Sequence, residues 1–299
     1  MRNILILQRR GVRNRSQVRK QNKMINKLYN EDCFETMKRM EEESIKIDAV
    51  ITSPPYNTSR VGASDKYNSR YDTFQDFKTN ENYIDWTVKI FNNYDKILKK
   101  DGCVLYNISY SSENTSLIWL VIADIIRKTN FTTADCIIWK KGNALPNNRS
   151  KNKLTRIIEY VFVFVRKDEL KTFNANKKVV SRIEKTGQAN YENVFNFFEA
   201  RNNDGSNKLN KATYSTDFCE KLMNIYLKAG NLVYDSFMGI GTTANACIKN
   251  GLNFIGSELS EEQCKYAEDR IIKTMKERLK DKKQKTLEDS QKLSTTEEK

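Results

Sequence analysis

Histidine is absent from this chain of 299 residues. Its absence excludes Ser-His-Asp and Cys-His catalysis and most zinc sites, because these depend on an imidazole. The six cysteines include no Cys-x-x-Cys pair, so we interpret them as reduced, mostly buried residues. Apolar runs of membrane length are also absent, and the longest, at 118–126 and 160–165, suit a buried core. We therefore expect a cytoplasmic protein that holds no metal and contacts no membrane.

Proline is scarce, and two of the three prolines stand together in Ser53-Pro54-Pro55-Tyr56, directly after the apolar run 47–52. Consecutive prolines fix two φ angles and remove two backbone donors, which makes a stiff, extended corner. The Ser53 hydroxyl and the Pro54 carbonyl then offer converging hydrogen-bond acceptors beside the aromatic face of Tyr56. Such a corner suits a flat ring that carries an exocyclic amine. Taken alone, the tetrapeptide also fits an ordinary turn at a strand end.

Short apolar runs alternate with helical patterns along most of the chain, which predicts a largely parallel sheet with helices on both faces. The seven expected strands span residues 27–30, 47–52, 103–109, 135–140, 159–166, 232–237 and 253–258. The expected helices span residues 33–40, 83–98, 116–129, 216–228, 242–250 and 260 to about 280.

Three polar stretches interrupt this alternation, and each could be a simple solvated loop. Residues 57–80 follow the proline corner and could close over a substrate. Their basic residues include Arg60, Lys66 and Arg70. Residues 167–212 lack clear periodicity and lie between two expected core strands, where a recognition insertion would sit. Residues 281–299 are rich in Lys, Glu, Ser and Thr, which predicts disorder.

A glycine turn follows the apolar run at 232–237 and precedes a helix that begins at Thr242. Gly239 and Gly241 permit a tight turn and close backbone approach, and the helix start offers unpaired N–H groups. Glu258 ends the next expected strand, where a carboxylate can accept ribose hydroxyl protons. This pattern predicts a nucleotide site. It also fits NAD, but too few residues follow Gly241 for a second mononucleotide half and a substrate domain.

Ser53-Pro54-Pro55-Tyr56 resembles the catalytic motif of S-adenosylmethionine-dependent amino methyltransferases, which methylate adenine or cytosine amines in DNA. The sequence Asp-x-Phe-x-Gly-x-Gly-Thr-Thr at 235–243 resembles the cofactor motif of their β group. In that group the catalytic motif precedes a target-recognition region and the cofactor strand, and residues 25–272 keep this order. The resemblance implies an α/β, Rossmann-like methyltransferase fold with a seven-stranded, mostly parallel sheet, circularly permuted motifs and a small recognition insertion.

The resemblance also implies roles for single residues. Asp32 matches the acid that contacts the cofactor's adenine amine, although it equally fits a helix N-terminal acid. Glu258 matches the ribose ligand, and it also fits a partner of the helix that follows it. Thr213 lies where the family cradles the methionine end, but the His and Pro common there are missing. The cofactor loop and its support correspond to Asp235, Phe237, Gly239, Gly241 and Thr242.

The implied organisation is one methyltransferase domain with three additions. It comprises a basic arm (1–23), a catalytic part (24–166), a target-recognition region (167–212), a cofactor-binding part (213–280) and a disordered tail (281–299). The formal charge is +14, and residues 1–23 contain eight Arg and Lys residues and no acid. We interpret them as an arm that contacts DNA or as a dispensable extension, while Lys- and Asn-rich composition can also reflect base bias.

The implied partner is double-stranded DNA, contacted in part by Arg182 and by the basic residues of 57–80. The cell would be bacterial or phage-infected, a cognate restriction endonuclease is an open possibility, and monomer and homodimer both remain open. Serine at position 53 occurs in the family more often with cytosine, and a neutral hydroxyl can also donate to the cytosine ring nitrogen. We therefore expect methylation of cytosine N4 after base flipping. Adenine N6 is the alternative, and an inactive DNA-binding relative is a more remote one.

Overall fold

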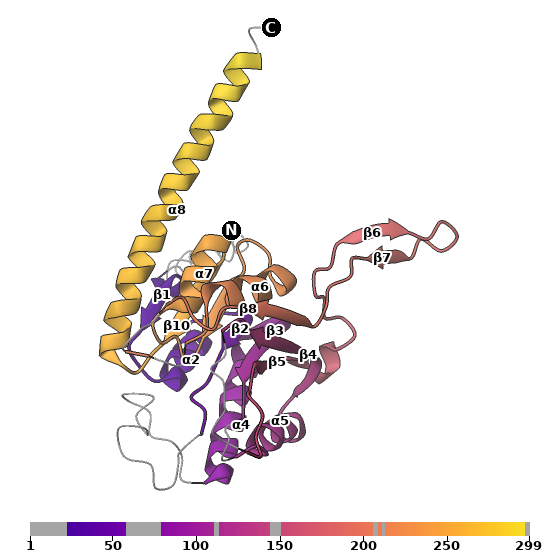
Figure 1. The fold of residues 1–299 in the computed structure, drawn as a ribbon, viewed down its shortest axis with the longest axis vertical. Coiled ribbons are helices and arrows are strands. Elements are labelled where there is room, and N and C mark those ends of the chain that lie inside the picture. Colours follow the sequence, from indigo (N-terminus) through magenta and orange to yellow (C-terminus); the bar gives the residue numbers. More distant parts are fainter. Residues whose placement is uncertain are drawn as a thin grey trace, which may run out of the picture.

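The computed structural model describes residues 23–57, 79–110, 114–143, 151–205, 209–210 and 213–296. Eight strands of this part form one sheet in the order β1-β10-β9-β2-β3-β5-β4-β8 (Figure 1). Their bounds are β1 (Lys27–Tyr29), β2 (Ile47–Thr52), β3 (Leu98–Ile108), β4 (Phe131–Lys141), β5 (Ile158–Arg166), β8 (Phe197–Ala200), β9 (Leu232–Asp235) and β10 (Asn253–Ser257). Only β5 runs against its neighbours, which confirms the mostly parallel sheet.

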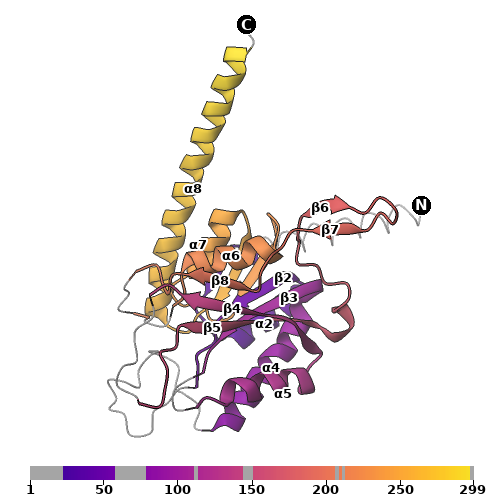
Figure 2. The ribbon, with the colours of Figure 1, turned by 45° about the vertical axis from the view of Figure 1, so that its right-hand side comes forward.

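Helices cover both faces of the sheet, as Figure 2 shows. One face carries α2 (Cys33–Glu42), α4 (Asn80–Ile97) and α5 (Leu117–Lys128), and the other carries α6 (Thr216–Tyr226), α7 (Thr242–Asn250) and α8 (Glu261–Thr296). The two cores follow from strand alternation, because successive side chains of a strand point to opposite faces. In β2, Val50 packs in the cluster of Phe91 from α4, whereas Ala49 and Ile51 pack in the cluster of Phe218 from α6.

The sheet has one strand more than the seven expected. The additional strand, β8, lies inside the predicted recognition region and pairs with β4 in parallel, with Trp139 opposite Phe198. Its four residues are too few and too exposed to show a clear strand pattern. The same region also contains a short 3-10 helix, η1 (Lys167–Glu169), and an antiparallel hairpin of β6 (Val179–Arg182) and β7 (Ala189–Tyr191). This hairpin projects from the body of the molecule (Figure 1).

The C-terminal helix differs most from expectation. α8 continues to Thr296, so the predicted end at about Lys280 was too early, and residues 281–296 of the predicted disordered tail are helical. The tail sequence contains neither Gly nor Pro and is rich in Lys, Glu, Gln and Leu, which are good helix formers. Two other predictions lie outside the described residues: almost all of the basic arm, and the loop that carries Arg60, Lys66 and Arg70.

Candidate functional site

A cavity lies at the carboxyl ends of β2, β9 and β10, where binding sites of parallel sheets are usually found. Its empty space is about 930 Å³, including the open mouth, which falls in the range of small-molecule sites. The lining brings together eight residues that the sequence predicted. They are Asp32, Ser53, Pro55, Thr213, Phe237, Gly239, Thr242 and Glu258. Four of the predicted catalytic and cofactor residues do not line it: Pro54, Tyr56, Asp235 and Gly241.

Asp235 lies beneath the cavity, 1% exposed, and connects the proline corner to the glycine turn. One carboxylate oxygen accepts from Thr52 Oγ1 (2.7 Å) and from the Phe237 N–H (3.0 Å). The other accepts from Tyr214 OH (3.0 Å) and Thr243 Oγ1 (2.5 Å). Burial raises the pKa of Asp235, and these donors oppose the rise. Asp235 therefore holds the ends of β2 and β9 in register without facing a ligand.

The glycine turn places Glu258 at the cavity. Gly239 has φ 54° and donates its N–H to Glu258 Oε2 (2.8 Å), while Ser260 N–H donates to Oε1 (2.9 Å). Burial raises the pKa of Glu258 despite these donors. Gly241 has another role: it caps α7 with φ 81°, and a Cβ there would lie 3.0 Å from Ala267 Cβ. A glycine is therefore required at position 241 so that the turn can pack against α8, and not for contact with the cavity.

Asp32 stands at a helix N-terminus, one of the two roles that the sequence left open, and it also lies in the cavity wall. Its side chain caps α2 by accepting from the Phe34 N–H at 2.8 Å. Trp86 of α4 is a lining residue that the sequence analysis missed; its ring lies 5.5 Å from that of Phe237. Nothing in a helical pattern marks one aromatic side chain as a cavity residue, so no sequence signal could have identified Trp86.

The two prolines of the corner differ in the hydrogen bonding of their carbonyls. Tyr83 OH donates to the Pro55 carbonyl at 3.1 Å, whereas no described residue donates to the Pro54 carbonyl. Ser53 lines the cavity, and its Oγ lies 3.1 Å from Tyr56 OH. Tyr56 borders a second, smaller hollow. Asn57 also lines this hollow, and its Oδ1 is buried with no hydrogen-bond partner among the described residues.

A further residue of the corner was also missed by the sequence analysis. Tyr56 OH donates to Glu159 Oε2 at 3.3 Å, and the other Glu159 oxygen forms an ion pair with Lys141. Glu159 stands on β5, so sheet pairing and not sequence proximity brings it to Tyr56.

The predicted DNA-binding residues lie elsewhere or outside the description. Arg182 stands at the end of β6 in the projecting hairpin, where it donates to the Gly187 carbonyl at 3.0 Å. Within the described ranges no group of three or more Cys, Asp or Glu side chains is arranged to hold a metal ion. No helix in those ranges is both long and apolar enough to span a membrane.

Comparison with known proteins places this site in a family. Residues 47–269 match the N6_N4_Mtase family, described as DNA methylase. The type II methyltransferase M.BglII of Bacillus subtilis is 24% identical over 257 residues, covering 80% of this chain and 66% of that protein. The chain thus spans just under two thirds of this relative.

Solved structures agree in fold. The crystal structure of the M1.HpyAVI-SAM complex is 25% identical, with a TM-score of 0.54, and the match covers 82% of this chain and 98% of the other. The cytosine-N4-specific PvuII DNA methyltransferase is 17% identical, with a TM-score of 0.59 and coverage of 85% and 92%. At 17% identity the second likeness concerns the fold alone.

Proposed function

The chain belongs to the N6_N4_Mtase family of DNA methylases, and we propose that it transfers a methyl group from S-adenosylmethionine to an exocyclic base amine in DNA. The observation that carries this proposal is the shared wall of the cavity. Ser53 and Pro55 of the proline corner line the same space as Phe237, Gly239 and Glu258 of the nucleotide-binding turn. A methyl donor in the cavity would therefore lie against the corner that holds the acceptor amine.

The residues present fit S-adenosylmethionine. The Glu258 and Asp32 carboxylates line the cavity and can accept from ribose hydroxyls and from the adenine amine, respectively. Trp86 and Phe237 offer flat apolar surface for the adenine ring. Thr213 lines the part of the wall that would receive the methionine end. When bound, this cofactor would supply an activated methyl group on a sulfonium.

The corner's task is to make an aromatic amine nucleophilic. The lone pair of such an amine is delocalised into the ring, and acceptors aimed at its N–H bonds favour the pyramidal form that directs the lone pair outward. Ser53 Oγ and the Pro54 carbonyl, to which no residue of the described ranges donates, would provide these acceptors. A base inside a duplex cannot reach them, so the target must flip out at a cost of a few kcal/mol. Stacking on Tyr56 would recover about 1 to 3 kcal/mol.

DNA contacts are proposed for the predicted recognition region, 167–212. The β6–β7 hairpin projects from the body of the molecule (Figure 2). Arg182 stands on β6, and Lys185 stands in the turn between the two strands. Two-stranded ribbons fit the major groove, and basic side chains supply phosphate contacts.

Cytosine N4 is the target that we propose first, because serine at position 53 favours it within the resemblance. Adenine N6 is a second candidate, and a specific contact favours it. If the Ser53 hydroxyl donates to Tyr56, it presents only acceptor lone pairs to a base, as the aspartate common in adenine-specific relatives would.

The test is to incubate the purified chain with S-adenosylmethionine and duplex DNA, digest the DNA to nucleosides and identify the products by mass spectrometry. We expect N4-methyl-2′-deoxycytidine. N6-Methyl-2′-deoxyadenosine alone would establish the second candidate, and neither nucleoside, with no cofactor binding by calorimetry, would indicate an inactive DNA-binding relative.

A further inference from the structure

A line of three polar groups runs from the cavity wall into the sheet. Ser53 Oγ lies 3.1 Å from Tyr56 OH, and Tyr56 OH lies 3.3 Å from Glu159 Oε2. The Glu159 side chain is 12% exposed, and its other oxygen is ion-paired with Lys141 of the neighbouring strand β4. Main-chain pairing of β4 with β5 places Glu159 opposite Trp139, so Lys141 reaches it diagonally along one face. The position of Glu159 is thereby fixed by both backbone and side chain.

The order of donors along this line follows from the carboxylate. An ionised carboxylate only accepts hydrogen bonds, so the Tyr56 proton must point to Glu159. The Tyr56 oxygen then has only lone pairs toward Ser53, and the Ser53 hydroxyl must donate its proton to Tyr56. Both lone pairs of Ser53 Oγ are left for a partner in the cavity.

We propose that Glu159 is a positioning residue for catalysis, which acts through Tyr56 to orient the Ser53 hydroxyl as an acceptor for the target amine. This inference rests on the proposed function. Without the carboxylate, the Tyr56 and Ser53 protons can rotate, and part of the time Ser53 would present its own proton to the amine and oppose its hydrogen bond. The same contacts hold the Tyr56 ring by its hydroxyl, so its face keeps one orientation for stacking.

A double-mutant cycle separates this role from a merely structural one. Glu159→Gln keeps the side-chain shape but introduces an amide that can donate as well as accept. Tyr56→Phe keeps the ring and removes the hydroxyl that links the other two groups. With saturating S-adenosylmethionine and DNA, we expect each substitution to lower kcat roughly ten- to a hundred-fold, the range for loss of a hydrogen bond to a charged group. The cofactor Kd should not change.

The decisive comparison is the variant with both substitutions. If Glu159 acts only through the Tyr56 hydroxyl, the double variant will be no slower than Tyr56→Phe alone. If Glu159 only stabilises the sheet, the two substitutions will act independently, and their fold decreases in kcat will multiply. This outcome would overturn the proposal. A Glu159→Gln kcat within about twofold of the wild type would overturn it as well.

The control is Glu41→Gln on α2. Glu41 forms an ion pair with Lys96 at 3.3 Å, so the substitution makes the same change of charge in another ion pair. Glu41 lies outside the cavity wall and the recognition region, and kcat should remain at the wild-type value. Failure of the proposed function is distinguishable, because the wild-type chain itself would then methylate no base. Thermal unfolding of every variant verifies that the protein assayed is folded.

Discussion

Two carboxylates of the site, one buried and one half-buried, differ in what surrounds them. Asp235 has four donors from the protein and no contact with the cavity, so its charge is compensated within the fold. Glu258 has two backbone donors, and it lines the open space where a ligand can add more. Cofactor binding should therefore change the titration of Glu258 and leave that of Asp235 unchanged.

Cofactor affinity should therefore decrease in mild acid. Burial raises the pKa of Glu258, so the group takes up a proton at a higher pH than an exposed glutamate. The pKa of Glu258 is higher in the folded than in the unfolded state, so ionisation of Glu258 makes the ligand-free protein less stable as pH rises. A ligand that needs the carboxylate binds better at high pH. Calorimetry between about pH 5 and 8 should show affinity rising with pH.

Glu258→Gln should remove most of this pH dependence and cost about 2 kcal/mol of binding free energy at neutral pH. Glu261→Gln provides the control, because Glu261 is exposed at the start of α8 and pairs with Lys265, which lowers its pKa. An unchanged pH profile in Glu258→Gln would show that this carboxylate is not the ribose acceptor.

Residues of local motifs could be predicted from the sequence, and residues that meet through tertiary contacts could not. Asp32, Ser53, Gly239 and Glu258 each stand at the end of an apolar run or beside a turn, and a recognisable pattern follows them. Glu159 is an acid within a strand more than one hundred positions from its partner Tyr56. Only pairing of β5 in the sheet brings the two together.

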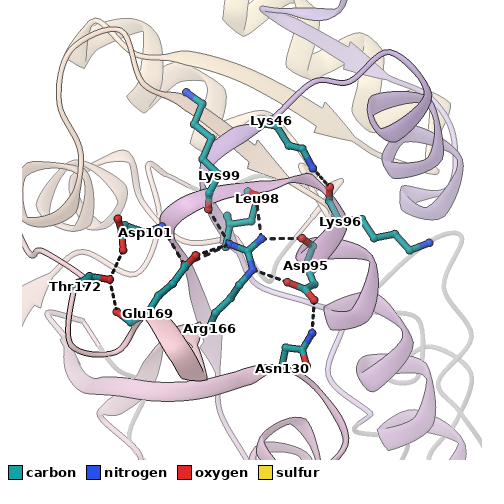
Figure 3. Close-up of polar contacts among 10 residues, drawn as sticks. All are labelled: Lys46, Asp95, Lys96, Leu98, Lys99, Asp101, Asn130, Arg166, Glu169 and Thr172. Carbon is teal, nitrogen blue, oxygen red and sulfur yellow. Dashed lines mark hydrogen bonds and ion pairs between the residues drawn. The ribbon is translucent and has the colours of Figure 1, made fainter.

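At the scale of elements, one arginine joins four segments at the edge of the sheet opposite the cavity. Figure 3 shows Arg166, at the end of β5, surrounded by the last turn of α4, the start of β3 and η1. Its guanidinium donates to Asp95 Oδ1 (2.5 Å), to the carbonyls of Asp95, Leu98 and Lys99 (2.7 to 2.9 Å) and to Glu169 (3.3 Å). All three nitrogens have partners, and the side chain is 15% exposed.

Arg166→Lys should lower the free energy of unfolding by about 3 kcal/mol, because an ammonium cannot reach these acceptors together and leaves several of them without their donor. Urea denaturation measures this loss. Lys128→Met removes the ion pairs of an exposed lysine with Asp124 (3.0 Å) and Asp85 (3.4 Å), and it should destabilise the fold much less than Arg166→Lys does. Cofactor affinity should stay at the wild-type value in both. Equal stability of the two variants would contradict a structural role for Arg166.

Element boundaries were predicted where the sequence contains its own stop signals. α7 was predicted at its observed bounds, because the Gly241 and Gly251 turns enclose it, both with positive φ. α8 has no such signal at its C-terminal end, since no Gly or Pro follows Gly256. β8 was missed because its identity depends on pairing with β4 and not on its own four residues.

At the scale of the whole molecule, the sheet interleaves both ends of the chain. β9 and β10 pair between β1 and β2, so the cofactor turn from the C-terminal part lies beside the proline corner from the N-terminal part. Parallel strands present their carboxyl ends at one edge, which is why motifs separated by the whole recognition region could be predicted to meet. Positive charge is distributed differently, since a large share lies in residues 1–23, outside the motifs.

Binding strength and site choice should therefore be separable by deletion. Removing residues 1–23 takes away eight positive charges and no motif residue. If the arm binds phosphates, the slope of log affinity against log salt should become shallower by about 0.9 for each phosphate that the shortened chain no longer neutralises, while the methylated sequence stays the same.

Replacing residues 179–191 of the β6–β7 hairpin by a short glycine linker should have the converse effect. Site choice should be lost while cofactor affinity persists, because the hairpin forms a separate sheet away from the cavity. Methylation of a mixed-sequence DNA library followed by sequencing measures site choice, and binding titrations at several salt concentrations measure the slope. An unaltered slope would identify residues 1–23 as a dispensable extension, and an unaltered site after hairpin replacement would place recognition in another segment.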